Sequence, residues 1–462
     1  HKTVASLGLL GYEGYVLDTL HVNLSGDGDQ RTISSNLTLR DSIPTELQLH
    51  ADFGPGRWKF NQGEFNVGSA QFEFLPKGTL VWAGEELQVN TLGFEGKDGR
   101  IVANGKLLNN GNDVLRLKLE HIDSKVLNYV LRIPDLELGG QFGGTVNIKN
   151  TLSAPEIYSE FTCTDFGLNG YTYGRLNAGL RYQKDGDVFA QGFLRNKGTA
   201  LMNFGGHYDA QSTDLDVRIG LDQLEISPLN PLLGGVLDQL EGRLQGGVSV
   251  YGPVDNWSIG GSFALSKGHF TVPVIGAELA TMEDAEITIS NDKITLDSTT
   301  FYVPNDSTTA VAWGTIYHDR FDQIVFDLRF HTDSMRAVDM DRAIDGYFYG
   351  TAIAAGDMVL EGPLEQLHLD LALATKDGTN FKIPLDNPTA VETPNFLRFV
   401  TLEANDTLKT TKKQLEYFTT DMAIEATKAA KLELVLDEVL GDVIKAQGSG
   451  NLRLKLLDDE SM

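Results

Sequence analysis

The stretch LHLDLAL, residues 367–373, places leucine at every second position. Successive side chains of a β-strand point to opposite faces, so this alternation predicts a strand with one apolar and one polar face. Similar alternation recurs at residues 47–53, 115–119, 432–436 and 452–456. The sequence therefore predicts a protein built almost entirely from half-buried strands.

Short turn signals separate these predicted strands. They are Asp27-Gly28, Asp98-Gly99, Asn110-Gly111, Asp185-Gly186, Asn291-Asp292 and Asp377-Gly378. Such pairs favour tight antiparallel hairpins. Because long crossover helices are missing from the pattern, a parallel α/β sheet is excluded. Short helices are expected near residues 227–232, 334–344 and 393–400.

So much half-apolar sheet must bury its apolar face somewhere. Without a helical layer, the sheet must fold onto itself, close, or stay open around an apolar ligand. We find no linker rich in proline or serine, and strands spaced about 4.8 Å apart in one sheet would extend well past roughly 100 Å. We therefore expect an elongated antiparallel β-groove, although tandem sandwiches would produce the same alternation.

One type of segment recurs within residues 144–157, 247–259 and 358–369. The last two copies share a strand, a Gly-Pro turn and a second strand, with turns at Gly252-Pro253 and Gly362-Pro363. Repeated units that each expose an apolar face stack into arrays. This pattern predicts an internally repeated sheet.

The composition limits the partners of the chain. A net charge of −26 over 462 residues repels nucleic-acid phosphates and anionic lipid headgroups, so we expect no nucleic-acid partner. The single cysteine, Cys163, rules out an internal disulfide. The sequence has no run of about 18 or more apolar residues, so it predicts no membrane-spanning helix.

Motifs of catalysis and cofactor binding are missing from the sequence. The nine histidines are scattered, and no P-loop, nucleophile elbow or dinucleotide fingerprint occurs. We expect Cys163 to be inert packing and Asp339, Asp341 and Asp345 to lie on a solvated helix face. The prediction is no enzyme, no metal and no cofactor, although a glycosidase-type carboxylate pair stays open at this point.

The run LEGRLQGGVSVYGPVDNWSIGGSFAL, residues 240–265, resembles the repeat that opens the C-terminal region of TamB proteins, which are AsmA-like. Residues 379–400 resemble TamB proteins of the Bacteroidetes type, and residues 436–452 resemble the strand pair that follows in this family. We therefore expect residues 1–222 to form the N-terminal part of the groove and residues 223–462 the TamB-type region. The family's N-terminal anchor and final strands are not in this sequence, so we expect an internal fragment.

The resemblance implies a periplasmic bridge with a taco-like β-groove. Its apolar interior would carry phospholipid acyl chains between the inner and outer membranes. The protein would act with an outer-membrane barrel of the BamA superfamily and be anchored to the inner membrane through a segment not in this chain. It would also serve outer-membrane biogenesis, with no catalytic residue.

The candidate groove residues are the apolar members of the alternating stretches. They are Leu115, Leu117, Ile287, Ile289, Ile294, Leu296, Ile324, Phe326, Leu328, Leu367, Leu369, Leu371, Leu432, Leu434, Leu452 and Leu454. Ordinary core packing is the alternative for each one.

Two other functions fit an all-β chain. One is a surface adhesin or carbohydrate-binding scaffold, which needs exposed aromatic platforms, whereas the tryptophans at positions 58, 82, 257 and 313 are scattered. The other is a parallel β-helix enzyme, which the hairpin signals disfavour.

Overall fold

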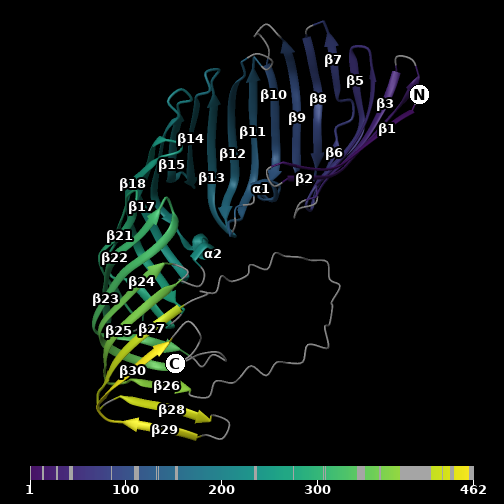
Figure 1. Cartoon of the computed structure of the whole chain (residues 1–462). Helices are drawn as coiled ribbons and strands as arrows, with labels where there is room; N and C mark the ends of the chain where they lie inside the picture. The colour runs from purple at the N-terminus through teal and green to yellow at the C-terminus, as the bar shows by residue number, and fades with distance from the viewer. Residues whose placement is uncertain are drawn as a thin grey trace. The chain divides into compact units, whose positions relative to one another are not determined.

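Figure 1 shows the chain as a computed structural model. The structure describes residues 2–12, 15–27, 30–40, 45–84, 86–108, 114–131, 133, 135–150, 154–233, 237–273, 275–304, 306, 308–340, 349–363, 366–384, 418–428, 430–437 and 442–456.

The chain divides into two compact units. Unit 1 comprises His1–Asp222 and Ser249–Ser258, and unit 2 comprises Gln223–Val248 and Ile259–Met462. Strands make up most of the described residues in both units, which confirms the predicted all-β class. The division into family regions at residues 222 and 223 stays a prediction.

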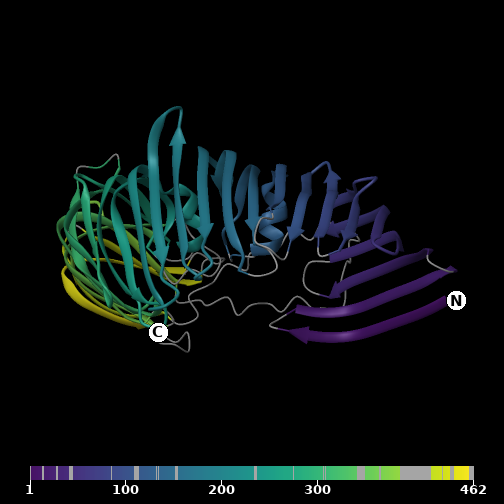
Figure 2. The same ribbon diagram turned by 90° about the horizontal axis from the view of Figure 1, so that it is seen from above.

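Unit 1 is an antiparallel sheet in which the strands other than β6 and β7 pair with their neighbours in sequence, and Figure 2 shows these strands side by side. The strands are β1 (Lys2–Tyr12), β2 (Tyr15–Asp27), β3 (Gln30–Arg40), β4 (Thr45–Gly54), β5 (Arg57–Val67), β6 (Ala70–Phe74), β7 (Thr79–Ala83), β8 (Glu86–Gly96), β9 (Gly99–Leu108), β10 (Val114–Asp123), β11 (Leu138–Lys149), β12 (Glu156–Leu168), β13 (Tyr171–Tyr182), β14 (Val188–Asn196), β15 (Thr199–Tyr208) and β16 (Asp214–Glu225). β6 and β7 each pair with both β5 and β8, so together they occupy one strand position.

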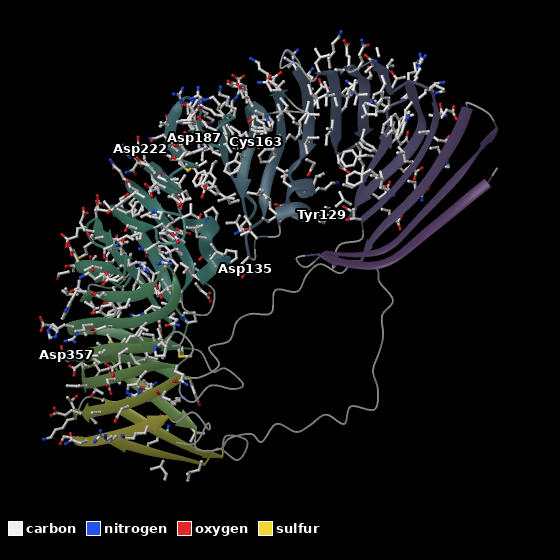
Figure 3. The ribbon with its side chains drawn as sticks, turned by 45° about the horizontal axis from the view of Figure 1, so that its top comes forward. Tyr129, Asp135, Cys163, Asp187, Asp222 and Asp357 are labelled. Carbon is white, nitrogen blue, oxygen red and sulfur yellow. The ribbon has the colours of Figure 1, made fainter. Side chains whose placement is uncertain are left out.

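A helix that the sequence pattern did not predict, α1 (Ser124–Leu131), follows β10. The Asp123 carboxylate accepts the backbone N–H of Lys125 at 3.0 Å, which caps the start of this helix. The hydroxyl of Tyr129 lies 3.0 Å from that of Ser69, in the turn between β5 and β6 (Figure 3). These contacts hold α1 against the sheet.

Apolar clusters mark where each unit buries side chains. The cluster named here the α1 cluster contains Val67, Ala70, Phe72, Ile122 and Val126. A second cluster of unit 1 contains Ala51, Phe60 and Phe74. The cluster of unit 2 contains Leu279, Phe301, Val303, Ala310, Ala312, Met335, Ala337, Ala354 and Met358.

Unit 2 contains most of the remaining strands. They are β17 (Asp238–Pro253, in unit 2 up to Val248), β18 (Ser258–Val272), β19 (Ala277–Thr281), β20 (Ala285–Ile289), β21 (Lys293–Tyr302), β22 (Thr309–Asp319), β23 (Asp322–Met340), β24 (Tyr349–Pro363), β25 (Leu367–Thr375), β26 (Asn380–Pro384), β27 (Phe418–Ala426), β28 (Lys431–Asp437), β29 (Asp442–Gln447) and β30 (Gly450–Leu456). Most pairs are antiparallel, but β25 pairs with β27 and β26 pairs with β28 in parallel. The sequence pattern did not predict these two parallel pairs.

The predicted short helices have different outcomes. Near residues 227–232 the structure has a 3-10 helix, η1 (Ser227–Leu229), followed by α2 (Asn230–Leu233), so this prediction is confirmed. The helix predicted at residues 334–344 is wrong, because β23 continues as a strand to Met340 and pairs there with β24. Asp339 therefore lies on a strand. The helix predicted at 393–400 and two further aspartates, at positions 341 and 345, lie outside the described residues.

The Asp377-Gly378 pair does not make the predicted hairpin. β25 and β26, on either side of it, both pair with β24, so the chain continues in one direction through a local interruption. Thr379 stabilises the interruption: its hydroxyl donates to the carbonyl of Ile353 at 2.8 Å and accepts the N–H of the same residue at 3.0 Å. The pair thus marks a kink within a strand rather than a reversal.

An asparagine clasp occurs twice in the structure, just before the first two segments of the predicted repeat. The side-chain amide of Asn128 donates to the carbonyl of Leu138 and its oxygen accepts the N–H of Leu138, both at 2.9 Å. Asn230 makes the same two bonds to Leu240, at 2.9 and 2.6 Å. The two clasps are offset by 102 residues at both positions (128 to 230, 138 to 240). Each clasp ties a short helix to the beginning of the next strand.

Backbone conformation follows the same offset. His121 and Gln223 have φ values of 51° and 55°, in a region that few non-glycine residues adopt. Gly140 and Gly242, two residues beyond the clasped leucines, also have positive φ. Matching strain at matching positions supports a true repeat of strand, helix, clasp and strand.

Candidate functional site

One face of unit 1 is apolar across β10 to β16. The strand register aligns its residues in rows that cross the sheet. The rows are Leu115–Ile148–Ile157–Tyr182–Val188–Tyr208–Leu215, Leu117–Val146–Ser159–Leu180–Ala190–Gly206–Val217, and Phe161–Ala178–Gly192–Phe204–Ile219. We call this surface the unit 1 apolar face.

Most side chains of the unit 1 apolar face are only half-buried. Leu180, in the middle of the second row, is 39% exposed, although Ser159 and Ala190 flank it on the two neighbouring strands. A strand surrounded by other strands is covered at its flanks but not above its face. A broad apolar surface left accessible to water is a site for an apolar partner.

The opposite face of the same strands is polar. One row there runs Arg116–Asn147–Tyr158–Arg181–Phe189–His207–Asp216. The guanidinium of Arg181 lies 4.7 Å from the centroid of the Phe189 ring, and this ring stacks on His207. Cation–π contacts thus shield the aromatic rings of this polar face.

Unit 2 repeats the division into two faces. The rows of its apolar face are Gly261–Ile289–Ile294–Ile316–Phe326, Phe263–Ile287–Leu296–Gly314–Leu328–Leu360–Leu369, and Phe330–Met358–Leu371–Met422. We call this surface the unit 2 apolar face. On the other face, Asp421 accepts hydrogen bonds from Arg453 at 2.8 and 3.1 Å, and Lys455 forms an ion pair with it at 2.9 Å.

The register brings most of the predicted groove residues onto these two faces. Leu115 and Leu117 lie on the unit 1 apolar face, and the predicted residues from 287 to 328, together with Leu369 and Leu371, follow the unit 2 apolar face. Ile324 alternates in phase with Phe326 on β23.

Four predicted residues can be placed only by their backbones. Leu432 and Leu434 pair with Phe381 and Ile383, and Leu452 and Leu454 pair with Ile424 and Met422. The side chains of these four lie outside the described ones.

Some predicted positions take part in ordinary packing. Leu367 is only 2% exposed, and Leu296 and Leu371 pack against the buried cluster of unit 2. A lining role for each predicted residue stays a prediction.

Sequence reasoning named no candidate groove residue on β13 to β16, although it predicted a hairpin at Asp185-Gly186. Val188, Ala190, Phe204 and Val217 belong to the unit 1 apolar face, but glycines and polar residues interrupt their alternation. Only the register, in which a glycine such as Gly192 stands beside Phe204, shows that the row is continuous.

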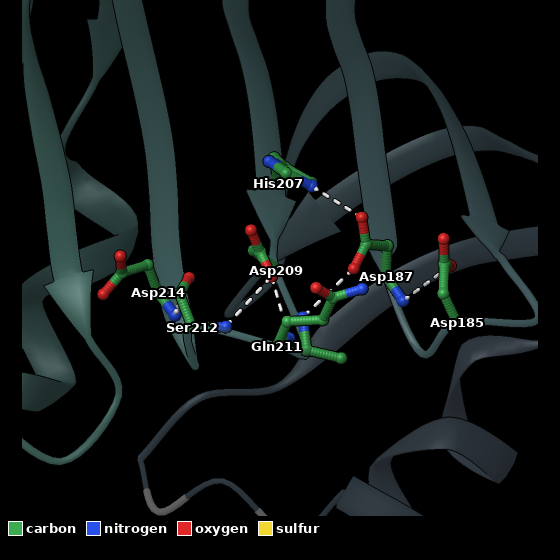
Figure 4. Close-up of polar contacts among 8 residues, drawn as sticks. Asp185, Asp187, His207, Asp209, Gln211, Ser212 and Asp214 are labelled. Carbon is green, nitrogen blue, oxygen red and sulfur yellow. Dashed lines mark hydrogen bonds and ion pairs between the residues drawn. The ribbon is translucent and has the colours of Figure 1, made fainter.

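Carboxylates gather at the turns after β13 and β15 (Figure 4). Asp187 accepts the N–H of Ala210 at 3.1 Å and lies 3.4 Å from His207. Backbone N–H groups of Ser212 and Gln211 donate to Asp209, which holds the pKa of its carboxyl below the usual value. Here the carboxylates satisfy turn amides, a structural role.

Other reactive groups are similarly passive. Cys163 is buried, and burial raises the pKa of its thiol to about 11, which disfavours the nucleophilic thiolate. Within the residues that the structure describes, no histidine, cysteine and carboxylate side chains gather in a group that could hold a metal ion. Across the same residues, no helix has the length and apolar character needed to span a membrane.

Two tryptophans that are distant in sequence lie together. The rings of Trp58 and Trp82 are 5.5 Å apart, and Trp58 packs against the buried cluster of Ala51, Phe60 and Phe74. This contact explains Trp58 as core packing, with Trp82 at its margin.

Comparison with known families gives a match in the C-terminal part of the chain. The model of the TamB C-terminal domain matches residues 298–460. The comparisons with curated proteins and with solved structures found no match.

Proposed function

Residues 298–460 of this chain belong to the TamB family, and from that premise we propose that the chain is a non-catalytic periplasmic bridge for phospholipids between the inner and outer membranes. Acyl chains bind on its apolar faces, and an outer-membrane barrel of the BamA superfamily is its partner in outer-membrane biogenesis. A segment outside this chain anchors the protein to the inner membrane.

The observation that carries the proposal is the register of the apolar rows. In unit 2, Leu328, Leu360 and Leu369 stand side by side on three strands, and the next row repeats the pattern. Each acyl CH₂ group that leaves water contributes about 0.8 kcal/mol, so one chain can be held firmly. Because neighbouring rows offer nearly equal contacts, a bound chain can move from row to row with little change in free energy.

A charge placed on the apolar face tests the proposal. Leu328→Asp puts a carboxylate into the middle of a row, whereas Val325→Asp adds the same charge on the opposite face of the same strand, where Val325 is already 37% exposed. Bringing a carboxylate against an acyl chain costs several kcal/mol, so Leu328→Asp should lower the bound lipid at least about tenfold. Val325→Asp should leave it unchanged.

Mass spectrometry of protein purified from the bacterial envelope gives the readout. Circular dichroism confirms that both variants keep their strands. A benzophenone amino acid in place of Phe326 provides a second readout that introduces no charge, and it should cross-link to phospholipid. If the wild-type protein carries no phospholipid and forms no cross-link, the lipid-binding proposal fails and a purely structural scaffold is the better explanation.

A further inference from the structure

Part of the unit 1 sheet has its apolar side covered. In the α1 cluster, Ala70 and Phe72 are 0% and 2% exposed, and Val126 of α1 packs among them. On β12 to β16 the row that contains Leu180 is open on the corresponding side, since Leu180 is 39% exposed, whereas Cys163 and Leu194, farther along the same face, are 1% exposed. The same antiparallel sheet thus passes from a covered part to an open part, and α1 lies at the change (Figures 1 and 2).

Polar anchors hold α1 in place. The ammonium of Lys125 lies 2.5 Å from the carboxylate of Asp98, and this hydrogen bond raises the pKa of Lys125. At the other end of the helix, the Tyr129 hydroxyl contacts Ser69. The Tyr129 ring sits so close to Gly68 that a Cβ atom there would come within 2.5 Å of it. Both anchors join segments far apart in sequence, and the Asn128 clasp to Leu138 adds two hydrogen bonds that hold α1.

The second copy of the repeat lacks these anchors. At the offset of 102 residues, Ser227 replaces Lys125 and Pro231 replaces Tyr129. Neither residue can form the corresponding ion pair or ring contact. α2 has only four residues, and its Leu232 is 48% exposed. The clasp therefore belongs to the repeat, whereas the anchors are particular to α1.

We propose that α1 is a gate that sets how far an acyl chain travels along the sheet of unit 1. This inference rests on the proposed function and concerns its regulation. With α1 seated, an acyl chain on β12 to β16 stops at the α1 cluster. When α1 lifts, the aromatic side chains of β5 to β8 become accessible. Leu131 and Ile133, at the end of the helix, are 53% and 49% exposed and offer an arriving chain its first contact.

Gly68→Ala is the opening variant. Its methyl group collides with the Tyr129 ring and pushes α1 outward. Gly84→Ala is the matched control, because Gly84 also has positive φ, at 65° against 56°, but nothing lies within 4 Å of its added Cβ. Both variants carry similar backbone strain, so a difference between them reports the collision.

Photo-cross-linking to lipid at two positions measures whether α1 covers the sheet. A benzophenone amino acid replaces Phe94, which packs against the α1 cluster, or Phe204, on the open face. The protein is irradiated with vesicles of phosphatidylethanolamine and phosphatidylglycerol. Position 204 should cross-link to lipid in every background. Position 94 should cross-link weakly in wild type and Gly84→Ala, and several-fold more in Gly68→Ala.

A covalent lock completes the test. In a Cys163→Ala background, a short bismaleimide bridges Asp98→Cys and Lys125→Cys and should keep cross-linking at position 94 low even with Gly68→Ala. Cross-linking at 94 that is equal in all three backgrounds, or that survives the lock, overturns the gate while lipid binding at 204 stands. No cross-linking at 204 overturns the proposed function itself.

Discussion

Replacing the clasp residue Asn230 with alanine should loosen the start of β17. The Asn230 side chain donates to Leu240 at 2.9 Å and to Ser227 at 2.8 Å, and accepts the N–H of Leu240 at 2.6 Å. Alanine removes all three hydrogen bonds and leaves both polar groups of the Leu240 backbone without this partner. The higher helix propensity of alanine returns only a few tenths of a kcal/mol.

The size of the effect follows from these bonds. At about 1 kcal/mol net for each hydrogen bond, the local cost is about 2 to 3 kcal/mol. Because about 1.4 kcal/mol corresponds to a factor of ten, hydrogen exchange of the Leu240 amide should accelerate roughly 30-fold to 150-fold. Asn128→Ala, in the first copy of the repeat, removes two hydrogen bonds, so exchange of the Leu138 amide should accelerate by about the lower figure, roughly 30-fold.

Hydrogen exchange resolved by residue, using NMR or fragmentation mass spectrometry, measures this change. Asn177→Ala serves as the control, because the Asn177 amide donates across the sheet to Thr162 at 3.1 Å and does not touch Leu240. An Asn230→Ala protein whose Leu240 amide exchanges as slowly as in wild type would refute the clasp as a stabilising element.

Two further predictions concern titratable groups. Hydrogen bonds from Arg453 and Lys455 lower the pKa of Asp421, so they stabilise β27 and β30 above the unfolded carboxyl pKa of about 3.9. This stabilisation should be lost as the pH falls through the lowered value, and a ¹³C titration of the Asp421 carboxyl with a midpoint at or above 3.9 would contradict it. Since the pKa of Cys163 rises from 9.0 to about 11, alkylation by iodoacetamide at pH 8 should be at least about 100-fold slower than for an ordinary thiol. Reaction in urea should restore the ordinary rate, and equal rates with and without urea would show that the thiol is not buried.

Local patterns predicted local structure well. Alternation at residues 367–373 gave the correct strand, because a strand's two faces depend only on its own residues. Gly252-Pro253 and Gly362-Pro363 end β17 and β24, with φ of 100° and 103° at the glycines, and the expected turns follow directly after them. Positive φ at glycine is a property of the residue itself, so the sequence was sufficient here.

Pairing between distant segments overrode two other local patterns. Residues 334–344 suggested a helix, but the strand hydrogen bonds from β23 to β24 continue as far as Met340. The eight residues of α1 were too short to stand out as a helix in the sequence. That helix depends on the Asp123 cap and on the contact between Tyr129 and Ser69. These last two residues are 60 positions apart in the chain.

The sequence by itself determined that this chain is a β-protein whose strands have one apolar side. Only the tertiary structure decided which part of that side is covered. Alternation specifies the side on which a residue lies, whereas coverage depends on contacts between segments far apart in the chain. Ala70 and Leu180 belong to similar strands, yet α1 lies against the cluster of Ala70 and leaves Leu180 open to water.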